Sequence, residues 1–202
     1  MKKSLIWIGG LVLLAIILYS SLSGVYNGLV TSEQGVNKTW ADVQGAYQRR
    51  ADLIPNLVAT VKQYANYEQQ TLIQVIEARA KATKTDINID PKNLDANTLA
   101  KFQESQGQLT SDLSKLLVIV EQYPQLKANE NFMQLQNELE RTENRINVER
   151  RNFNDAVQQY NTKLLKFPTN LLASMFGFKE KAYFEADKGA ENAPKVDDLF
   201  NK

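Results

Sequence analysis

Three carboxylates and one arginine are the side chains of this sequence best suited to chemistry. Glu143 and Glu149 lie in residues 138–154, ELERTENRINVERRNFN, which contain four acids and four bases. Asp52 and Arg50 lie in a second charged stretch nearer the N-terminus. Carboxyl groups with shifted pKa values perform general acid–base catalysis. Asp52, Glu143 and Glu149 are therefore the candidates for an enzyme that works with carboxylates alone.

The partner groups that most such enzymes use are missing from the sequence. The chain contains no histidine and no cysteine. This excludes thiol catalysis, the Ser-His-Asp relay, zinc sites of the Cys/His kinds and the Glu-x-x-His di-iron site. No glycine-rich phosphate loop or metal-spaced acidic pair accompanies the three carboxylates. The sequence therefore predicts a protein that is not an enzyme, with no catalytic residue, cofactor or metal ligand.

The charge balance argues against nucleic acid as a partner. The 202 residues hold 24 bases and 23 acids, and residues 1–24 hold two of those bases and no acid. Proteins that bind nucleic acid concentrate a basic excess on one face. No such excess remains in this sequence after residue 24.

The N-terminus has the pattern of a membrane anchor. Lys2 and Lys3 precede a strictly apolar run, residues 5–18, and no further charge appears before Glu33. About 20 apolar residues in a helix cross a bilayer. A cleaved signal peptide is the alternative, but no A-x-A cleavage site follows the run. We predict an uncleaved single-pass anchor over residues 1–24 in the cell membrane, with the two lysines cytoplasmic and the bulk of the protein extracytoplasmic.

Beyond the anchor, apolar residues recur at heptad spacing in three segments, as in helices that pack along a seam. The first segment continues to about Lys84, and Pro55 predicts a kink or short break in it. Residues 83–93 form a loop, Asp95 caps the second helix and Pro124 ends it. Asn129 caps the third helix. Its stripe consists of Phe132, Leu139, Ile146, Phe153, Tyr160 and Phe167, and Pro168 follows.

These elements define an all-α fold. We predict an elongated antiparallel helical bundle of three long heptad-patterned helices plus a short C-terminal helix, behind an N-terminal transmembrane helix. The bundle would cover residues 25–184. Residues 185–202 are charged, small and proline-containing, which predicts a flexible tail.

The charged residues Arg50 and Glu149 can be placed in this predicted fold. Arg50 and Glu149 fall on the heptad seams, and a buried charge requires a partner. An Arg50–Glu149 or Arg50–Glu143 structural ion pair that fixes the register of the helices is the simplest interpretation; a reactive carboxylate or a ligand contact is the alternative. Asn154 and Asn161, seven residues apart beside seam aromatics, also favour a register role over ligand binding.

Residues 169–184, TNLLASMFGFKEKAYF, are unusually apolar, and Thr169 is placed to cap a short helix. This segment is the predicted interaction surface. It could cover the bundle, lie on a membrane surface with its lysines at the headgroups, or dock a partner protein. Its apolar members are Leu171, Leu172, Met175, Phe176, Phe178 and Phe184.

Several motifs in this order resemble the LemA family. They are RRADLIPNLVATV, YPQLKANENFMQLQNELERTENRI, RRNFNDAVQQYN, FPTNLLA and the tail APKVDDLF, and together they cover nearly the whole chain from about residue 26. The resemblance implies a bacterial single-pass membrane protein with a long helical bundle and no established enzymatic activity. It also implies a link to membrane remodelling, magnetosome formation or envelope maintenance. The extra Asp-Leu before Phe200 departs from the family's usual ending.

The sequence leaves three functional hypotheses. The first is a membrane-anchored helical scaffold or adaptor of the bacterial cell envelope, which acts on an unidentified protein partner or the lipid bilayer and is capable of homo-oligomer formation. The second is a membrane-shaping protein that grips one bilayer with its anchor and aromatic C-terminal helix. The third is the carboxylate-dependent enzyme, which the missing partner groups disfavour.

Overall fold

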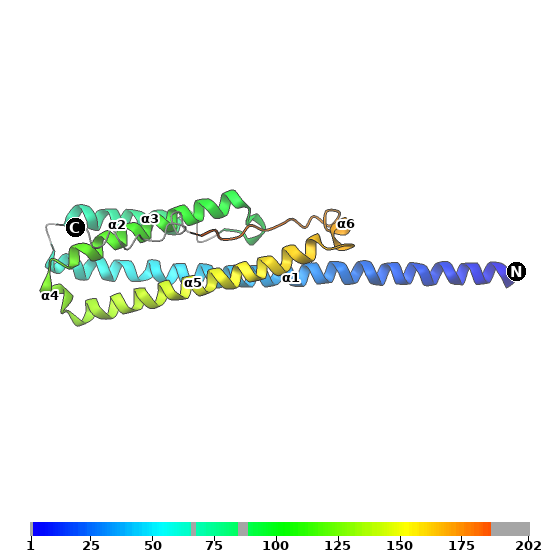
Figure 1. Cartoon of the computed structure of the whole chain (residues 1–202), viewed down its shortest axis with the longest axis horizontal. Helices are drawn as coiled ribbons and strands as arrows, with labels where there is room; N and C mark the ends of the chain where they lie inside the picture. Colours follow the sequence, from blue (N-terminus) through cyan, green and yellow to red (C-terminus); the bar gives the residue numbers. More distant parts are fainter. Residues whose placement is uncertain (1, 66–67, 85–88, 187–202) are drawn as a thin grey trace, which may run out of the picture.

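The computed structural model describes residues 2–65, 68–84 and 89–186, and this part of the chain contains helices and irregular segments but no strand. The dominant element is α1, Lys2–Tyr64, a single helix of 63 residues. At 1.5 Å per residue it is roughly 95 Å long. Its N-terminal part projects alone beyond the rest of the molecule (Figure 1).

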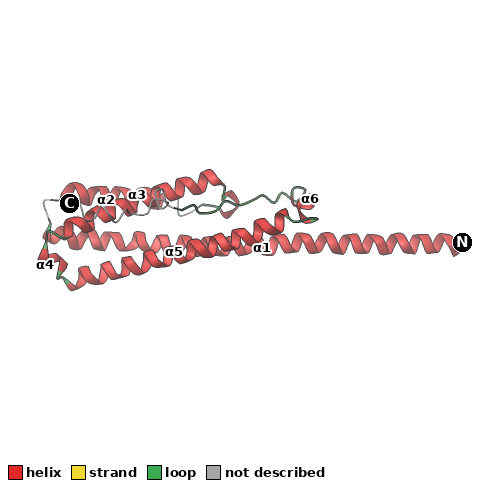
Figure 2. Cartoon of the chain, in the orientation of Figure 1, coloured by secondary structure: helices red, strands yellow, loops and turns green. Residues whose placement is uncertain are grey.

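The other elements pack along the remaining part of α1. They are α2 (Gln69–Lys84), the 3₁₀ helix η1 (Pro91–Asn93), α3 (Ala96–Val120), the short α4 (Pro124–Lys127), α5 (Glu130–Leu165) and α6 (Thr169–Ala173). The long helix α5 runs back along α1, and α2 pairs with α3 (Figures 1 and 2). Consecutive long helices are antiparallel, so α4 lies at the end distal to the anchor and α6 at the proximal end (Figure 1). The all-α elongated bundle predicted from the sequence is confirmed.

The bundle has two apolar clusters along its length. The proximal cluster is rich in aromatic rings, with Trp40 and Phe102 in edge contact at 5.3 Å between centroids. The distal cluster is mainly aliphatic, with Phe132 as its buried aromatic residue, and draws on α1, α2, α3, α4 and α5. Arg50 lies between them, since Tyr47 belongs to the proximal cluster and Ile54 to the distal one.

The first predicted segment is wrong in its extent. It does not continue to Lys84, because α1 ends at Tyr64 and α2 begins at Gln69 as a separate helix packed against α1 and α3. Within the described residues the bundle therefore has four long helices rather than three, namely α1, α2, α3 and α5. Val61 and Val75 differ by two heptads, so the apolar residues on the two sides of the reversal share one register, and the single polar residue at the position between them, Glu68, does not reveal it.

Of the kink or short break predicted at Pro55, the break is absent, because α1 continues as a helix through this residue. Proline has no N–H to offer the carbonyl four residues earlier, which is that of Ala51. The side chain of Arg79 on α2 fills this vacancy, since its Nε donates to the Ala51 oxygen at 2.7 Å. A buried carbonyl that would otherwise be unpaired is thus satisfied from a neighbouring helix.

Two of the three predicted helix caps are confirmed. The Asp95 carboxylate accepts from the Thr98 amide at 2.7 Å, and the Asn129 side chain accepts from the Phe132 amide at 3.0 Å. Thr169 does not cap α6, because it is already the first helical residue and Pro168 occupies the cap position. The heptad stripe of α5 is buried or half-buried up to Tyr160, but Phe167 lies beyond the helix and is 79% exposed.

Candidate functional site

Arg50 is the centre of a polar layer between the two apolar clusters. The residue is 2% exposed, and its Nη1 lies 3.0 Å from Glu143 Oε2 on α5 and 2.9 Å from Thr110 Oγ1 on α3. Its Nη2 donates to the side-chain oxygen of Gln106 at 2.6 Å, and its guanidinium lies over the Tyr47 ring. The layer therefore joins three helices, as a register-fixing ion pair requires.

The structure decides which of the two predicted partners Arg50 contacts. It contacts Glu143, whereas Glu149 is bound by Arg145 on the same helix at 2.6 Å and by Asn152. The Glu149 carboxylate is buried, but Arg145 is largely exposed, so this pair reaches the surface. The two glutamates thus belong to separate ion pairs one turn and a half apart on α5. Their role in setting register stays a prediction.

The three candidate carboxylates do not act on a common point. Asp52 accepts from Gln48 on the exposed side of α1 at 2.7 Å. Glu143 faces Arg50, and Glu149 faces Arg145. Among the residues that the structure describes, no group of three or more acidic side chains is arranged to hold a metal ion. The two glutamates of the charged stretch 138–154 that were candidates for catalysis are instead engaged in ion pairs with arginines.

A cleft lies beside the polar layer, between α3 and α5. It has a volume of about 330 Å³, and Arg50, Thr110 and Glu143 form its polar end. The rest of the lining consists of three leucines, Leu113, Leu117 and Leu139, together with the polar residues Ser114, Gln136 and Glu140. This shape can accept an apolar side chain of a partner, with hydrogen-bonding groups at one end.

Residues 178–186 form an extended strap, which is the main feature that the sequence analysis missed. After α6 the chain does not continue as a helix but passes along the bundle towards its middle (Figure 1). Asn161 holds the strap by donating to the Lys181 carbonyl at 2.9 Å and accepting from the Lys181 amide at 3.0 Å. Asn154 holds the backbone of Phe184 in the same way, at 3.0 and 2.9 Å.

The seven-residue spacing of these asparagines on α5 thus matches the strap's backbone, three residues apart. Seven helical residues rise about 10.5 Å, and three extended residues span about 10 Å. Each of the two asparagine side-chain amides can therefore pair with the backbone of one strap residue. The sequence signal was visible, two asparagines a heptad apart, but it does not reveal that their partner is main chain from the same protein.

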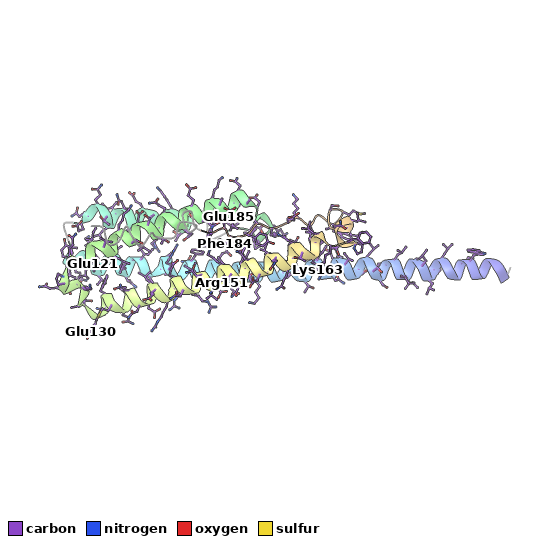
Figure 3. The ribbon with its side chains drawn as sticks, viewed as in Figure 1. Glu121, Glu130, Arg151, Lys163, Phe184 and Glu185 are labelled. Carbon is purple, nitrogen blue, oxygen red and sulfur yellow. The ribbon has the colours of Figure 1, made fainter. Side chains whose placement is uncertain are left out.

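Further contacts fix both ends of the strap. The Tyr160 hydroxyl donates to the Lys179 carbonyl at 2.9 Å, and burial together with the Glu33 charge raises the pKa of Tyr160 to about 12. The buried Lys181 ammonium lies 3.2 Å from Glu33 and donates to the Pro91 carbonyl. At the other end the Glu185 carbonyl, near Phe184 in Figure 3, accepts from side chains of α3 and α5.

The six residues of the predicted interaction surface separate into two groups. Phe184 is 6% exposed and stacks among the rings of Trp40, Phe102 and Phe153, so it covers the core. Phe178 is half-buried against Tyr26. The others lie at the proximal end, where Leu172 is half-buried and three residues are exposed: Leu171, Met175 and Phe176. The predicted tail, residues 185–202, lies largely outside the described residues, and its first residue is bonded to the bundle.

The projecting part of α1 is apolar and exposed. From Trp7 to Leu22 its large apolar side chains are exposed. The helix is long and apolar enough, by length and composition, to cross a membrane. The helix joins the rest of the molecule around Tyr26 and Gly28, because the Tyr26 ring packs against Phe176 and the Lys163 ammonium donates to the Gly28 carbonyl at 2.6 Å. A side chain at Gly28 would meet the end of Lys163, whereas Gly24 faces open space.

Comparisons with known proteins identify relatives of this chain. The chain is 26% identical over 172 residues to protein LemA of Metamycoplasma hominis, covering 85% of this chain and 74% of that protein. It is 27% identical over 186 residues to magnetosome protein MamQ 2 of Paramagnetospirillum magneticum and to magnetosome protein MamQ of Magnetospirillum gryphiswaldense, with 84% of this chain and 67% of each relative covered. The model of the LemA family matches residues 39–197, and the protein therefore belongs to the LemA family.

Proposed function

We propose that this protein is a membrane-anchored helical scaffold or adaptor of the bacterial cell envelope, which acts by binding rather than by catalysis. One observation carries the proposal: α1 passes as a single helix from an exposed apolar segment into the core of the bundle. Since long helices bend only gently, the bundle is held close to the bilayer that contains the anchor and keeps one orientation relative to the anchor helix. Such a rigid support suits a protein that positions others.

The bundle offers surfaces for a protein partner away from the membrane. The cleft beside Arg50 is open on one side, and Ser114 lies exposed on its rim. Met133, near the start of α5, is an exposed apolar residue close to the distal end. A scaffold needs at least two occupied places, and these two are on different helices.

Photocrosslinking in intact cells tests the proposal. A photoreactive residue is placed in the full chain at Ser114, at Met133, or at the exposed polar position Asn144 as a control. Defined protein adducts at Ser114 and Met133, and not at Asn144, support a scaffold. Adducts at one place support a simple adaptor. An absence of protein adducts at both positions would contradict either role.

Orientation is a separate part of the proposal. We place Lys2 and Lys3 on the cytoplasmic side and the bundle outside, because positive charge favours the cytoplasmic flank. The natural chain has no cysteine, so Asn144→Cys introduces a unique thiol. We expect a membrane-impermeant maleimide to label it in intact cells. Labelling that requires permeabilised cells would reverse the orientation.

A second candidate function is shaping of the membrane. It is favoured by the exposed apolar residues at the proximal end, which lie beside the root of the anchor and give the protein two places to grip one bilayer. Electron microscopy of vesicles that carry the full chain would distinguish it. Vesicles that narrow or tubulate as protein is added favour shaping, and unchanged vesicle size favours the scaffold.

A further inference from the structure

The α5–α6 turn, α6 and the turn after it carry an apolar surface at the proximal end of the bundle. We call it the collar and define it by its exposed members, which are Phe167, Leu171, Met175 and Phe176. Met175 is 77% exposed, and Phe167 is more exposed than any other phenylalanine in the described chain. Such a concentration of exposed apolar residues is unusual on a surface that faces only water.

The collar has a defined structure, held by aromatic contacts with α1. The Phe176 ring packs edge-on against Tyr26 of α1 at 5.1 Å, and the Phe178 ring packs against the same tyrosine at 5.8 Å. Gly177 between them has a φ of 79°, a left-handed conformation that glycine adopts without strain. This turn lets both flanking rings reach Tyr26. The collar is therefore held in one position on α1 by the contacts of the Phe176 and Phe178 rings with Tyr26.

The position of the collar along α1 identifies what it faces. Tyr26 follows Leu22, the last large apolar residue of the exposed run, by four residues. Four helical residues correspond to about 6 Å along the axis. The headgroup layer on each side of the hydrocarbon core is roughly 5–8 Å thick. If α1 spans the bilayer, the collar lies at the level of the headgroups.

The charges around the collar fit the same surface. Residues 163–180 contain three lysines and one glutamate, and Lys166 and Lys179 are exposed. Glu33 is the first acid on α1 after the apolar run, and the Lys181 ammonium neutralises it at 3.2 Å. Apolar side chains next to lysines are the pattern by which proteins lie in a bilayer interface, with the lysines near anionic headgroups.

We propose that the collar is a second membrane contact, which inserts Phe167, Leu171 and Met175 into the headgroup–acyl boundary of the bilayer that α1 crosses. This proposal rests on the anchoring of α1 in the proposed function. Two contacts on one rigid body restrict rotation and tilt, so the collar sets the direction in which the bundle leaves the membrane. A single helix would leave both free.

Spin labelling of the full chain tests the contact. Because the chain has no cysteine, the variants Leu14→Cys, Met175→Cys and Val118→Cys each carry one label, in the anchor, the collar and the exposed face of α3 respectively. The labelled proteins are reconstituted in vesicles of phosphatidylcholine and phosphatidylglycerol. Collisions with oxygen, which partitions into lipid, are compared with collisions with a nickel chelate, which stays in water. All three positions are exposed, so labelling leaves the core intact.

We expect the Leu14 label to show high oxygen and low nickel accessibility and the Val118 label to show the reverse. The Met175 label, at the headgroup–acyl boundary, should fall between them, with clearly more oxygen and less nickel accessibility than the Val118 label. If nickel reaches Met175 as freely as Val118, the collar lies in water and the proposal is wrong. If both reagents are excluded from Met175, protein covers the collar, and the proposal is equally wrong. In both of these cases a Leu14 label that is exposed to lipid would show that α1 still enters the membrane, so the proposed anchor would stand. Nickel access to Leu14 would instead remove the anchor and, with it, both proposals.

Discussion

The Nε of Arg79 donates to the carbonyl oxygen of Ala51, the acceptor that Pro55 leaves without its helical donor. The contact joins α2 to the middle of α1. It explains how a helix that carries an internal proline stays continuous, because the bond that proline removes is replaced from outside the helix.

A double-mutant cycle tests this replacement. Arg79→Met should destabilise the protein by about 1–3 kcal/mol, since the buried Ala51 carbonyl is left unpaired. Pro55→Ala restores a backbone N–H at position 55, so Arg79→Met should have a smaller effect in that background. Chemical denaturation of the four proteins in detergent micelles measures the difference. Equal effects of Arg79→Met in both backgrounds would show that the contact does not compensate for the proline.

The strap depends on the side chains of Asn154 and Asn161, which bond to its backbone. Asn161→Ala should expose the Lys181 amide to exchange and reduce stability by about 1–3 kcal/mol, because two strap hydrogen bonds lose their partner. Hydrogen exchange at residues 181–184 together with thermal unfolding measures both effects.

Asn144→Ala is the matched control, since this asparagine is exposed on the same helix and bonds to no strap residue. Its exchange profile should match that of the natural chain. Protection of Lys181 that survives Asn161→Ala would show that the strap is held by its aromatic contacts alone.

Removing the charge of Glu143 alone should destabilise the protein. Glu143→Gln leaves the Arg50 charge buried without a carboxylate, and we expect a loss of about 1–2 kcal/mol. This is below the value for a fully buried pair, because the Glu143 side chain is 44% exposed. Glu140→Gln, on the rim of the same cleft, should change the free energy of unfolding by no more than about 0.5 kcal/mol.

Arg50→Leu combined with Glu143→Leu should keep the helical fold, because neither charge is then left alone. Circular dichroism checks this expectation. A double variant that loses its helicity would mean that the pair does more than fix register.

Tyr160 predicts a specific loss of stability at high pH. Burial and the Glu33 charge raise the pKa of its phenol to about 12 in the folded protein, against about 10 in an unfolded chain. Between these values the unfolded chain releases the proton and the folded protein keeps it, so unfolding is increasingly favoured. This contribution is fully present below pH about 10 and declines as the pH rises towards 12.

Tyr160→Phe removes this titration. The difference in unfolding free energy between the natural protein and this variant should be constant below pH about 10 and should change between 10 and 12 in favour of the variant. Denaturant titrations across this range provide the measurement, and the ultraviolet absorbance of the phenolate reports the pKa directly. A Tyr160 that ionises near 10 would contradict the buried environment described here.

Individual features differed in how far they could be predicted. The caps Asp95 and Asn129 were predictable because a cap and the backbone N–H that donates to it lie within one turn. The reversal after Tyr64 was not, since Val61 and Val75 keep the heptad spacing on both sides of it. Burial of Arg50 followed from its seam position, but the choice of Glu143 over Glu149 depends on the relative height of two helices.

The sequence by itself determined the class of the molecule: helices, because apolar residues recur every three to four positions; an apolar N-terminal segment, because no charge interrupts it; and no thiol or imidazole chemistry, because the residues are absent. Only the tertiary structure decided that Asn154 and Asn161 hold a strap and that Phe184 covers the core while Met175 does not. Periodicity is a local property of neighbouring turns. A backbone partner 20 or 30 residues away is chosen only when the helices have packed and brought it within hydrogen-bond distance.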